Sequence, residues 1–442
     1  MDMKIKIIAI VVAAAVVVAA IGAYALLNDA DGDNVYVDAS LAIMGNANED
    51  SRIDQDDLDI IEEIISGETD PADHPLADAN NDGEVDQEDA DLLRDMIDHK
   101  YGITINVVCS NADGTPYVQD ITYPLRSTVV VGTNLLSTCI QVGAADYIVG
   151  YTKTNYGVAH APVIDNATCI GGSIFDLNTD ASITNFQNLD AQEGIDAVIT
   201  MPSVSYLKTS ATYISGAGIP ILRIDSSDGM DSVGGALTIG YLYGSETEST
   251  SYEFAELSYA VLEEITERVS GLEESEKKTF MAITMGYYIS QTDSAYTGVC
   301  EYAGGSTVTT LEGTGSVKIN DGDEYYLNWS PDHIISFRTL DYSIDYTDIT
   351  SNSTKTPQET WDQYSGYFDM MGESYENLVY INTSMPVTCR MAYIAEIFYP
   401  DLFEEGYGDS VHQQFVDNYM GYLGDFDVTE DMTTTITYAD VS

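Results

Sequence analysis

A twelve-residue pattern of oxygen-bearing side chains occurs twice near the start of this chain, at residues 46–57 and 78–89. In the second copy, Asp or Asn stands at positions 1, 3, 5, 9 and 12, and Gly83 stands at position 6, where such a loop turns sharply. A hard cation such as Ca²⁺ takes about six to eight oxygen ligands, and this spacing wraps them around one point. An apolar-periodic stretch follows each copy and predicts a helix. The sequence therefore predicts two EF-hand-like calcium loops, each leading into a helix.

The first copy departs from this pattern at two positions. Asn46 replaces the aspartate of position 1, and Ser51 replaces the glycine of position 6. The loss of a carboxylate weakens cation binding, and a side chain at position 6 strains the turn of the loop. We therefore expect the second loop to bind calcium more tightly than the first. Glu84 contributes its backbone carbonyl. The predicted calcium ligands are Asn46, Asn48, Asp50, Arg52, Asp54, Asp57, Asp78, Asn80, Asp82, Glu84, Asp86 and Asp89.

The duplicated loop–helix unit at residues 42–98 resembles a dockerin module, a calcium-binding domain that docks onto cohesin domains. We refer to residues 42–100 as the calcium-loop segment. The resemblance implies a cohesin-domain protein as partner, although Asn46 and Ser51 stand where dockerins usually have Asp and Gly. A calcium-stiffened spacer that docks nothing is the alternative interpretation. We expect the segment to unfold without calcium and the rest of the chain not to respond.

An uninterrupted apolar run covers residues 7–27 and follows Lys4 and Lys6. A membrane-spanning helix needs about 20 apolar residues, whereas the core of a signal peptide has only about 7 to 15. The run therefore predicts an anchor in the cytoplasmic membrane, and the preceding lysines place the rest of the chain outside the cell. A signal cleaved after Ala25 is the alternative. An acidic linker at residues 28–41 follows the run.

Charge and cysteine content exclude several classes of function. The chain has 73 Asp and Glu against 16 Lys and Arg, a formal net charge of −57. Such a surface repels nucleic acid and anionic lipid, so we exclude both as partners. Adaptation of a whole proteome to salt or acid would give the same bias. The five cysteines include no Cys-x-x-Cys pair, which argues against a structural zinc or iron–sulfur site.

Beyond residue 103, β-branched segments alternate with helical ones, which predicts an α/β fold. Strands are expected at residues 128–131, 147–152, 196–200 and 221–225, and a long helix at residues 251–270. The predicted architecture is two α/β lobes joined by that single helix and preceded by the small, all-α calcium-loop segment. The expected boundaries are 1–27 for the anchor or signal, 28–41 for the acidic linker and 42–100 for the calcium-loop segment. They are 103–246 for lobe 1, 247–272 for the helix and 273–442 for lobe 2.

Several stretches in this part of the chain resemble solute-binding proteins that serve importers of siderophores, haem and cobalamin. They are VVVGTNLLSTCIQVGAADYIVGYT, EGIDAVIT and AGIPILRID in the first half, and FMAITMGYYI, CEYAGG, SPDHIISF, NLVYIN and FYPDLF in the second. The resemblance implies a class III periplasmic-binding-protein fold, a metal chelate or corrinoid as ligand and an ABC permease as partner. Ser137 stands where the family often has a permease-binding Glu, which puts that docking in doubt.

In open α/β sheets, ligands bind beyond the carboxyl ends of the strands. This rule nominates side chains from both lobes, and Lys153 and Arg338 are the cations among them that an anionic chelate would need. The predicted ligand-binding residues are Asn134, Tyr151, Lys153, Tyr156, Met201, Ser203, Tyr287, Tyr288, Trp329, Arg338 and Asn382.

The sequence thus predicts an extracellular, membrane-tethered binding protein that captures an iron-chelate-type ligand for an ABC importer. The alternative is a surface adhesion or scaffold protein that uses the same fold in a cohesin–dockerin complex without transport. An enzyme is not expected, because the chain has no Gly-x-Ser-x-Gly elbow, phosphate-binding loop or zinc-protease motif. Calcium is the only cofactor predicted.

Overall fold

The computed structural model describes residues 39–111, 113–152, 164, 166–203, 205–225, 229–320, 323–338, 340 and 356–441. The predicted anchor at residues 7–27 lies outside these residues. Within the described part of the chain, no helix combines the length and apolar character needed to span a bilayer. Two compact units are present. Of the described residues, those within 39–152, 164–225 and 231–256 belong to unit 1, and 229, 230 and those within 257–441 belong to unit 2.

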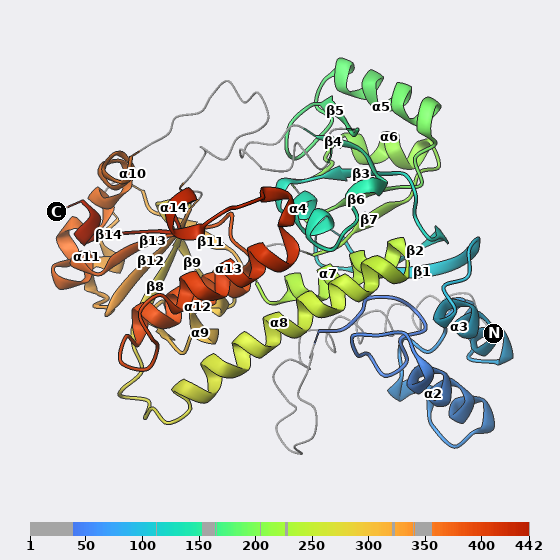
Figure 1. The fold of residues 1–442 in the computed structure, drawn as a ribbon, viewed down its shortest axis with the longest axis horizontal. Helices are drawn as coiled ribbons and strands as arrows, with labels where there is room; N and C mark the ends of the chain where they lie inside the picture. Colours follow the sequence, from blue (N-terminus) through green and yellow to red (C-terminus); the bar gives the residue numbers. More distant parts are fainter. Residues whose placement is uncertain are drawn as a thin grey trace. The chain divides into compact units, whose positions relative to one another are not determined.

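The main sheet of unit 1 has five parallel strands in the order β5-β4-β3-β6-β7 (Figure 1). Its strands are β3 (Thr128–Val131), β4 (Ile148–Thr152), β5 (Thr168–Gly171), β6 (Ala197–Thr200) and β7 (Ile221–Arg223). Its helices are α4 (Thr133–Gln141), α5 (Asp180–Glu193), α6 (Ser210–Gly216) and α7 (Asp231–Tyr243), with the short 3₁₀ turn η3 (Ala145–Tyr147). We call this sheet and these helices the first lobe.

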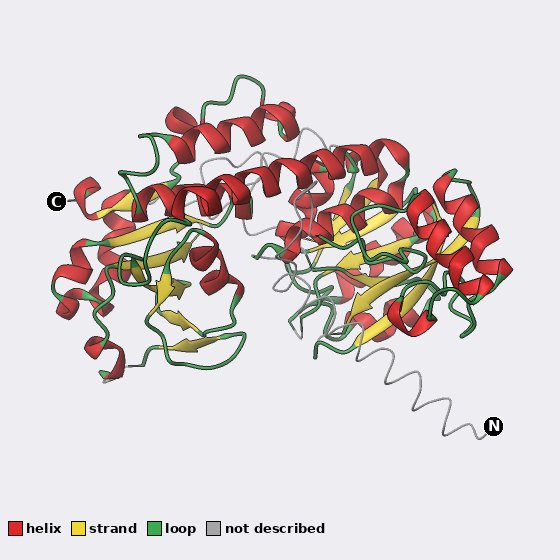
Figure 2. Cartoon of the chain, turned by 90° about the horizontal axis from the view of Figure 1, so that it is seen from below, coloured by secondary structure: helices red, strands yellow, loops and turns green. Residues whose placement is uncertain are grey.

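Burial of apolar side chains between the sheet and its helices explains the packing of this lobe. Val129 and Val131 of β3 are buried in one cluster with Phe186 of α5 and Ile214 of α6, whereas α4 and α7 contact each other. Figure 2 shows helices on both faces of the strands. The central strands β3 and β6 are therefore buried on both faces, as the near-continuous apolar runs of the sequence indicate.

The calcium-loop segment is also part of unit 1. Its helices are α2 (Gln55–Ser66) and α3 (Gln87–Ile97), separated by η2 (Pro71–Asp73). An antiparallel pair, β1 (Ile103–Ser110) and β2 (Pro116–Tyr123), follows. An isolated bridge between Ile43 and Val107 joins the segment to β1. The segment thus shares a compact unit with the first lobe.

One long helix, α8 (Ser245–Val269), falls in unit 1 up to Glu256 and in unit 2 from Leu257. It confirms the single long helix expected near this position. Helices α7 and α8 approach closely at Gly240, where a Cβ atom would overlap the side chain of Ser251. Only glycine allows this approach, because any side chain would force the helices apart.

Unit 2 contains a seven-stranded mixed sheet in the order β11-β9-β8-β12-β13-β14, with β10 beside β8. Its strands are β8 (Thr279–Thr284), β9 (Tyr288–Ser290), β10 (Ser306–Thr307), β11 (Ser316–Lys318), β12 (His333–Arg338), β13 (Leu378–Asn382) and β14 (Thr435–Thr437). Its helices are α9 (Ala295–Tyr302), α10 (Pro357–Tyr364), α11 (Glu373–Glu376), α12 (Val387–Phe398), α13 (Tyr407–Tyr419) and α14 (Val428–Asp431). Its 3₁₀ turns are η4 (Tyr325–Asn328), η5 (Ser365–Tyr367), η6 (Asp369–Met371), η7 (Gly421–Leu423) and η8 (Tyr438–Asp440).

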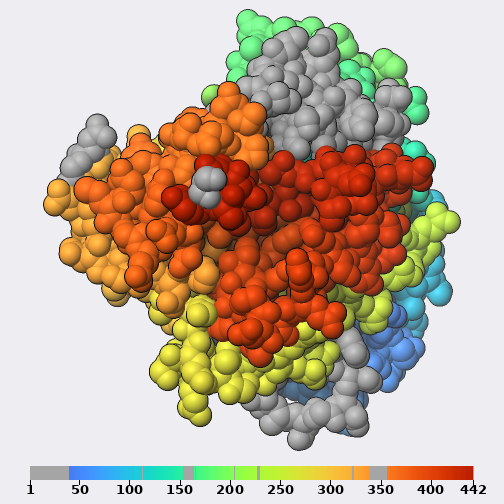
Figure 3. All heavy atoms as spheres, turned by 60° about the vertical axis from the view of Figure 1, so that its left-hand side comes forward, coloured from blue at the N-terminus to red at the C-terminus, as the bar shows by residue number. Residues whose placement is uncertain are grey.

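Strands β8, β12 and β13 are parallel, so their carboxyl ends meet at one edge of the sheet. In Figure 3 the C-terminal segment, coloured red, covers a broad part of the face in view. Both units contain a sheet and helices, which confirms the predicted α/β class.

All five cysteines are free thiols.

Candidate functional site

The second calcium loop is closed by its own carboxylates. The backbone N–H groups of Asp82 and Gly83 donate to the two carboxylate oxygens of Asp78, at 3.0 and 2.8 Å. Asp89, at position 12, accepts from the backbone N–H groups of Asn80 (3.0 Å) and Asp86 (2.8 Å). The carboxylates of positions 1 and 12 therefore hold the backbone of the loop, and Gly83 has the positive φ (99°) expected at position 6.

The first loop repeats the closure at its end but not at its start. Asp57 accepts from the backbone N–H groups of Asn48 (3.2 Å) and Asp54 (2.9 Å), as Asp89 does in the second loop. Asn46 instead donates its amide N–H to the carbonyls of Leu41 (2.9 Å) and Asp50 (2.7 Å). Its Oδ1 is buried and has no hydrogen-bond partner within the described residues. Ser51 is not among the residues with positive φ, so the turn strain that the sequence predicted there is not found.

These groups fit a hard cation. Burial raises the pKa of Asp57 to about 7, and burial also raises the pKa of Asp89, with Asp82 and Asp86 adding to the shift. A bound cation would relieve both costs and would give Asn46 Oδ1 a partner. Across the described ranges no three His, Cys, Asp or Glu side chains are grouped to hold a metal. Any ion would therefore depend on amide and backbone oxygens as well as carboxylates.

The carboxyl edge of the first-lobe sheet holds most of the residues nominated from this lobe. Asn134 lies in the first turn of α4, directly after β3, and Tyr151 lies near the end of β4. Met201 and Ser203 follow β6. Since β3, β4 and β6 are parallel, these residues come from one edge. Lys153 and Tyr156 lie outside the described residues.

Sequence reasoning missed Arg223 at this same edge. It is the last residue of β7, and its guanidinium donates to the carbonyl of Met201 at 3.1 Å. The sequence did contain a signal for Arg223, because a cation at the end of an apolar strand stands out in a chain with only 16 Lys and Arg.

In unit 2 the structure brings a cation and several aromatic rings together at the ends of β8 and β12. The guanidinium carbon of Arg338 lies 3.9 Å from the ring centroid of Tyr364. The ring centroid of Tyr287 lies 5.7 Å from that of Tyr367, with the rings stacked, and 4.9 Å from that of Tyr288, with the rings tilted. Such rings and cations suit flat or aromatic anions. The sequence nominated Tyr287, Tyr288 and Arg338, but it missed the two tyrosines that α10 and η5 contribute.

A tight turn between β8 and β9 supports this group. Met285 and Gly286 both have positive φ, 51° and 81°, and Arg338 donates to the carbonyl of Met285 at 3.0 Å. Methionine rarely adopts this conformation, and its side chain is 65% exposed. A Cβ at Gly286 would lie 2.5 Å from the ring of Tyr364. The turn therefore fixes Arg338 and Tyr364 relative to each other.

Two other nominated residues have structural contacts instead. Asn382 is fully buried at the end of β13, donates to the carbonyl of Thr433 at 2.8 Å and accepts from the N–H of Ser384 at 3.0 Å. Trp329 follows η4 and lies edge-on to Tyr325, against the apolar core of unit 2. These contacts within the protein do not test whether Asn382 or Trp329 binds a ligand.

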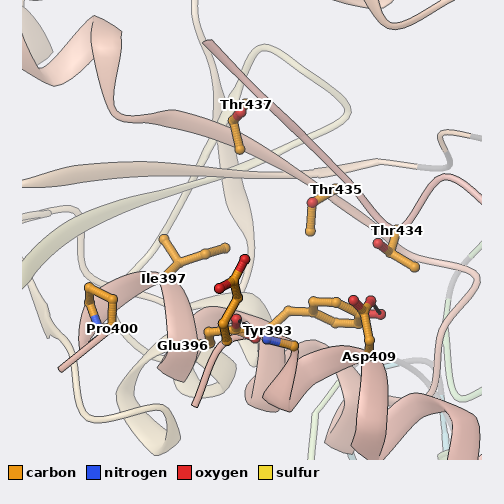
Figure 4. A pocket seen from close by; sticks show the side chains of 10 residues that line it. Tyr393, Glu396, Ile397, Pro400, Asp409, Thr434, Thr435 and Thr437 are labelled. Atoms are coloured by element: carbon orange, nitrogen blue, oxygen red, sulfur yellow. Dashed lines mark hydrogen bonds between the residues drawn. The ribbon is translucent and has the colours of Figure 1, made fainter. Parts of the chain in front are cut away.

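A pocket of about 680 Å³ lies elsewhere in unit 2, between α12, the start of α13 and β14 (Figure 4). Glu396, Glu405 and Asp409 line it, with threonines of β14 opposite. Glu396 accepts from the N–H groups of Gly406 (2.7 Å) and Gly408 (2.9 Å), and Tyr393 donates to Asp409 at 2.7 Å. These carboxylates thus hold the start of α13 in place.

Comparison with solved structures identifies the fold. A TroA-like periplasmic binding protein, FepB, from Veillonella parvula matches with a TM-score of 0.52 and 15% identity, covering 75% of this chain and 98% of its own. The molybdate periplasmic binding protein MolA of Haemophilus influenzae matches with a TM-score of 0.51 and 16% identity, covering 72% and 98%. Helicobacter pylori Ceue, solved with Ni(II) bound, matches with a TM-score of 0.50 and 14% identity, covering 74% and 100%.

No protein-family model matches the chain, and no curated protein shows significant similarity to it. The structural matches share too little sequence to show more than the fold. By their names the first two are periplasmic binding proteins. The chain therefore has the α/β fold of TroA-like periplasmic solute-binding proteins.

Proposed function

We propose that this protein captures a metal chelate of the siderophore, haem or cobalamin type outside the cell and delivers it to an ABC importer. The fold supports solute binding, and the named neighbours include proteins that bind molybdate and Ni(II). The observation that carries the ligand class is the group in unit 2: the guanidinium of Arg338 over the ring of Tyr364, with three further tyrosine rings in contact with one another nearby. Positive charge pairs with an anion, and the rings cover its flat or aromatic faces.

Native mass spectrometry of protein purified from its host tests this proposal, because a retained chelate adds a defined mass. Calorimetry with a ferric catecholate chelate then compares Arg338→Ala with Arg268→Ala. Arg268 is the matched control, since it also lies over aromatic rings, Phe403 and Tyr407, in unit 2. Weaker binding in Arg338→Ala alone supports the proposal. Equal affinity in both variants refutes this location of the site.

Calcium binding by the two loops is the second part of the proposal. It is supported by the buried, unpartnered Oδ1 of Asn46 and by the buried carboxylates of Asp57 and Asp89. A calcium titration of the EDTA-treated protein, followed by native mass spectrometry, should find two bound ions. The dockerin resemblance further suggests calcium-dependent binding of a cohesin domain. Retention of cohesin by the EDTA-treated protein would contradict that role.

Attachment to the cytoplasmic membrane completes the proposal. It rests on the apolar run at residues 7–27 and the lysines that precede it. N-terminal sequencing of the membrane fraction should find this run intact, and a mature start at Leu26 would show that it is a cleaved signal.

A surface adhesion or scaffold protein is the second candidate function. Ser137, at the position where the resemblance implies a permease-binding Glu, donates to the carbonyl of Thr133 in its own helix at 3.2 Å and carries no charge. Neighbouring genes for a permease and an ATPase favour transport, and their absence favours the scaffold.

A further inference from the structure

We infer that the calcium-loop segment is a structural part of the first lobe, so that calcium bound by its loops stabilises α7 and the unit 1 part of α8. This inference rests on the calcium binding proposed above. It gives the segment a role that a self-contained docking module would not have, because the first lobe then depends on it.

Hydrogen bonds join the calcium-loop segment directly to α7. The N–H of Ala42 donates to the hydroxyl of Thr238 at 3.1 Å. The hydroxyl of Tyr241 donates to the carbonyl of Met96, the penultimate residue of α3, at 3.2 Å. Tyr241 is fully buried. Met96 lies in the helix that follows the second loop, and this helix also contains Asp89 of that loop.

Two side-chain contacts join the segment to α8. The guanidinium carbon of Arg52 lies 3.4 Å from the ring centroid of Tyr252, and the imidazole Nε2 of His99 lies 2.9 Å from a carboxylate oxygen of Glu248. His99 Nδ1 lies 2.5 Å from the hydroxyl of Tyr123. Arg52 is at position 7 of the first loop, whose backbone carbonyl is a calcium ligand in such loops. A residue of the loop itself therefore packs on α8.

Both loop–helix units thus reach the first lobe. The first does so through Arg52, and the second through Met96 near the end of α3 and His99 just beyond it.

The physical consequence is thermodynamic linkage. An ion that binds the closed loop stabilises every structure that must open before the loop can open. With calcium at about 100 times its dissociation constant, the population of the open state falls about 100-fold. If α7 and α8 open together with one of the loops, exchange of their amide hydrogens slows by the same factor. The sequence predicted no response of the lobes to calcium, and these contacts lead us to expect one in the first lobe.

Hydrogen exchange of the full chain, with calcium and with EDTA, tests the inference. The double variant Asp57→Asn with Asp89→Asn removes the position-12 carboxylate of both loops. We expect it to abolish the calcium-dependent slowing of exchange in α7 and the unit 1 part of α8. Slowing of wild-type size in this variant overturns the inference.

A pair of tyrosine variants covers the case in which the double variant does not fold. Tyr252→Ala removes the ring under Arg52 but no calcium ligand, and Tyr213→Ala removes a similarly half-buried tyrosine of α6 that packs on Phe186. Two ions should bind to both variants by native mass spectrometry. In Tyr252→Ala alone, the calcium effect on exchange at residues 245–256 should shrink about tenfold. If the wild type binds two ions and exchange in α7 and α8 does not slow, this inference is refuted while the proposed calcium binding stands. Wild type that binds none refutes calcium binding itself.

Discussion

Lowering the pH should destabilise unit 2 through His412. This residue lies on α13, is 2% exposed, and packs edge-on to the ring of Tyr393 at 6.2 Å between centroids. Its Nδ1 has no hydrogen-bond partner within the described residues. Because burial disfavours the charged imidazole, the pKa of His412 falls from 6.5 to about 4.

The sign and size of the effect follow from proton linkage. Above pH 6.5 the imidazole is neutral in both the native and the unfolded chain, so pH has no effect through this group. Between pH 6.5 and 4 the unfolded chain binds a proton that the native chain does not, and the free energy of unfolding decreases. The loss reaches about 1.4 kcal/mol at pH 5.5 and about 2.5 kcal/mol at pH 4.5, and levels off below pH 4.

Urea denaturation of wild type and His412→Met, measured at several pH values between 7.5 and 4.5, isolates this contribution. The many carboxylates of the chain titrate in both proteins and cancel in the difference. The stability of the variant relative to wild type should therefore rise by about 2.5 kcal/mol as the pH falls from 7.5 to 4.5. A difference that stays constant over this range would refute the reasoning.

Three further predictions concern single substitutions. Arg338→Ala should weaken binding of an anionic chelate by about 1.5 to 3 kcal/mol in calorimetry, the range for a hydrogen bond to a charged group. Gly286→Ala should destabilise unit 2 by about 1 to 3 kcal/mol in urea denaturation, since its φ of 81° and the Tyr364 ring both oppose a side chain; unchanged stability would contradict the turn geometry. Gly240→Ala should cost about 1 to 3 kcal/mol by separating α7 from α8, whereas Gly216→Ala, with no atom within 4 Å of the added Cβ, should not lower stability.

The strands and the long helix could be predicted because their signals are local. The β-branched run at β3 was expected at residues 128–131, where the strand is found, and α8 was expected within a few residues of its observed start and end. Such signals depend on the side chains of the element itself and on its burial, both of which the sequence displays. The α/β class follows from their alternation.

The composition of the site in unit 2 could be predicted only in part. Tyr287 and Arg338 end or follow strands, so a rule about strand ends finds them. Tyr364 and Tyr367 come from α10 and η5, and only tertiary packing brings them to the ends of β8 and β12. Asn382 obeyed the strand-end rule but is enclosed by the chain around Thr433, which sequence position alone does not reveal.

The attachment of the calcium-loop segment also depends on non-local contacts. Its register of acidic residues resembles a self-contained module, and nothing in residues 42–100 shows that Tyr241 or Tyr252, far along the chain, would pack on it. A single stacked contact such as Arg52 on Tyr252 leaves no periodic trace in the sequence.

The packing of the calcium-loop segment on α7 bears on how the protein can be shortened for expression. A recombinant chain that starts at Tyr101 would look reasonable from the sequence, because it omits the loops and keeps both lobes. It would also uncover the rings of Tyr123 and Tyr241, which are 1% and 0% exposed in the intact protein, and leave the Tyr241 hydroxyl without the carbonyl of Met96. Newly exposed apolar surface of this kind promotes aggregation. A soluble short form should therefore begin before Ala39 and be purified with calcium present.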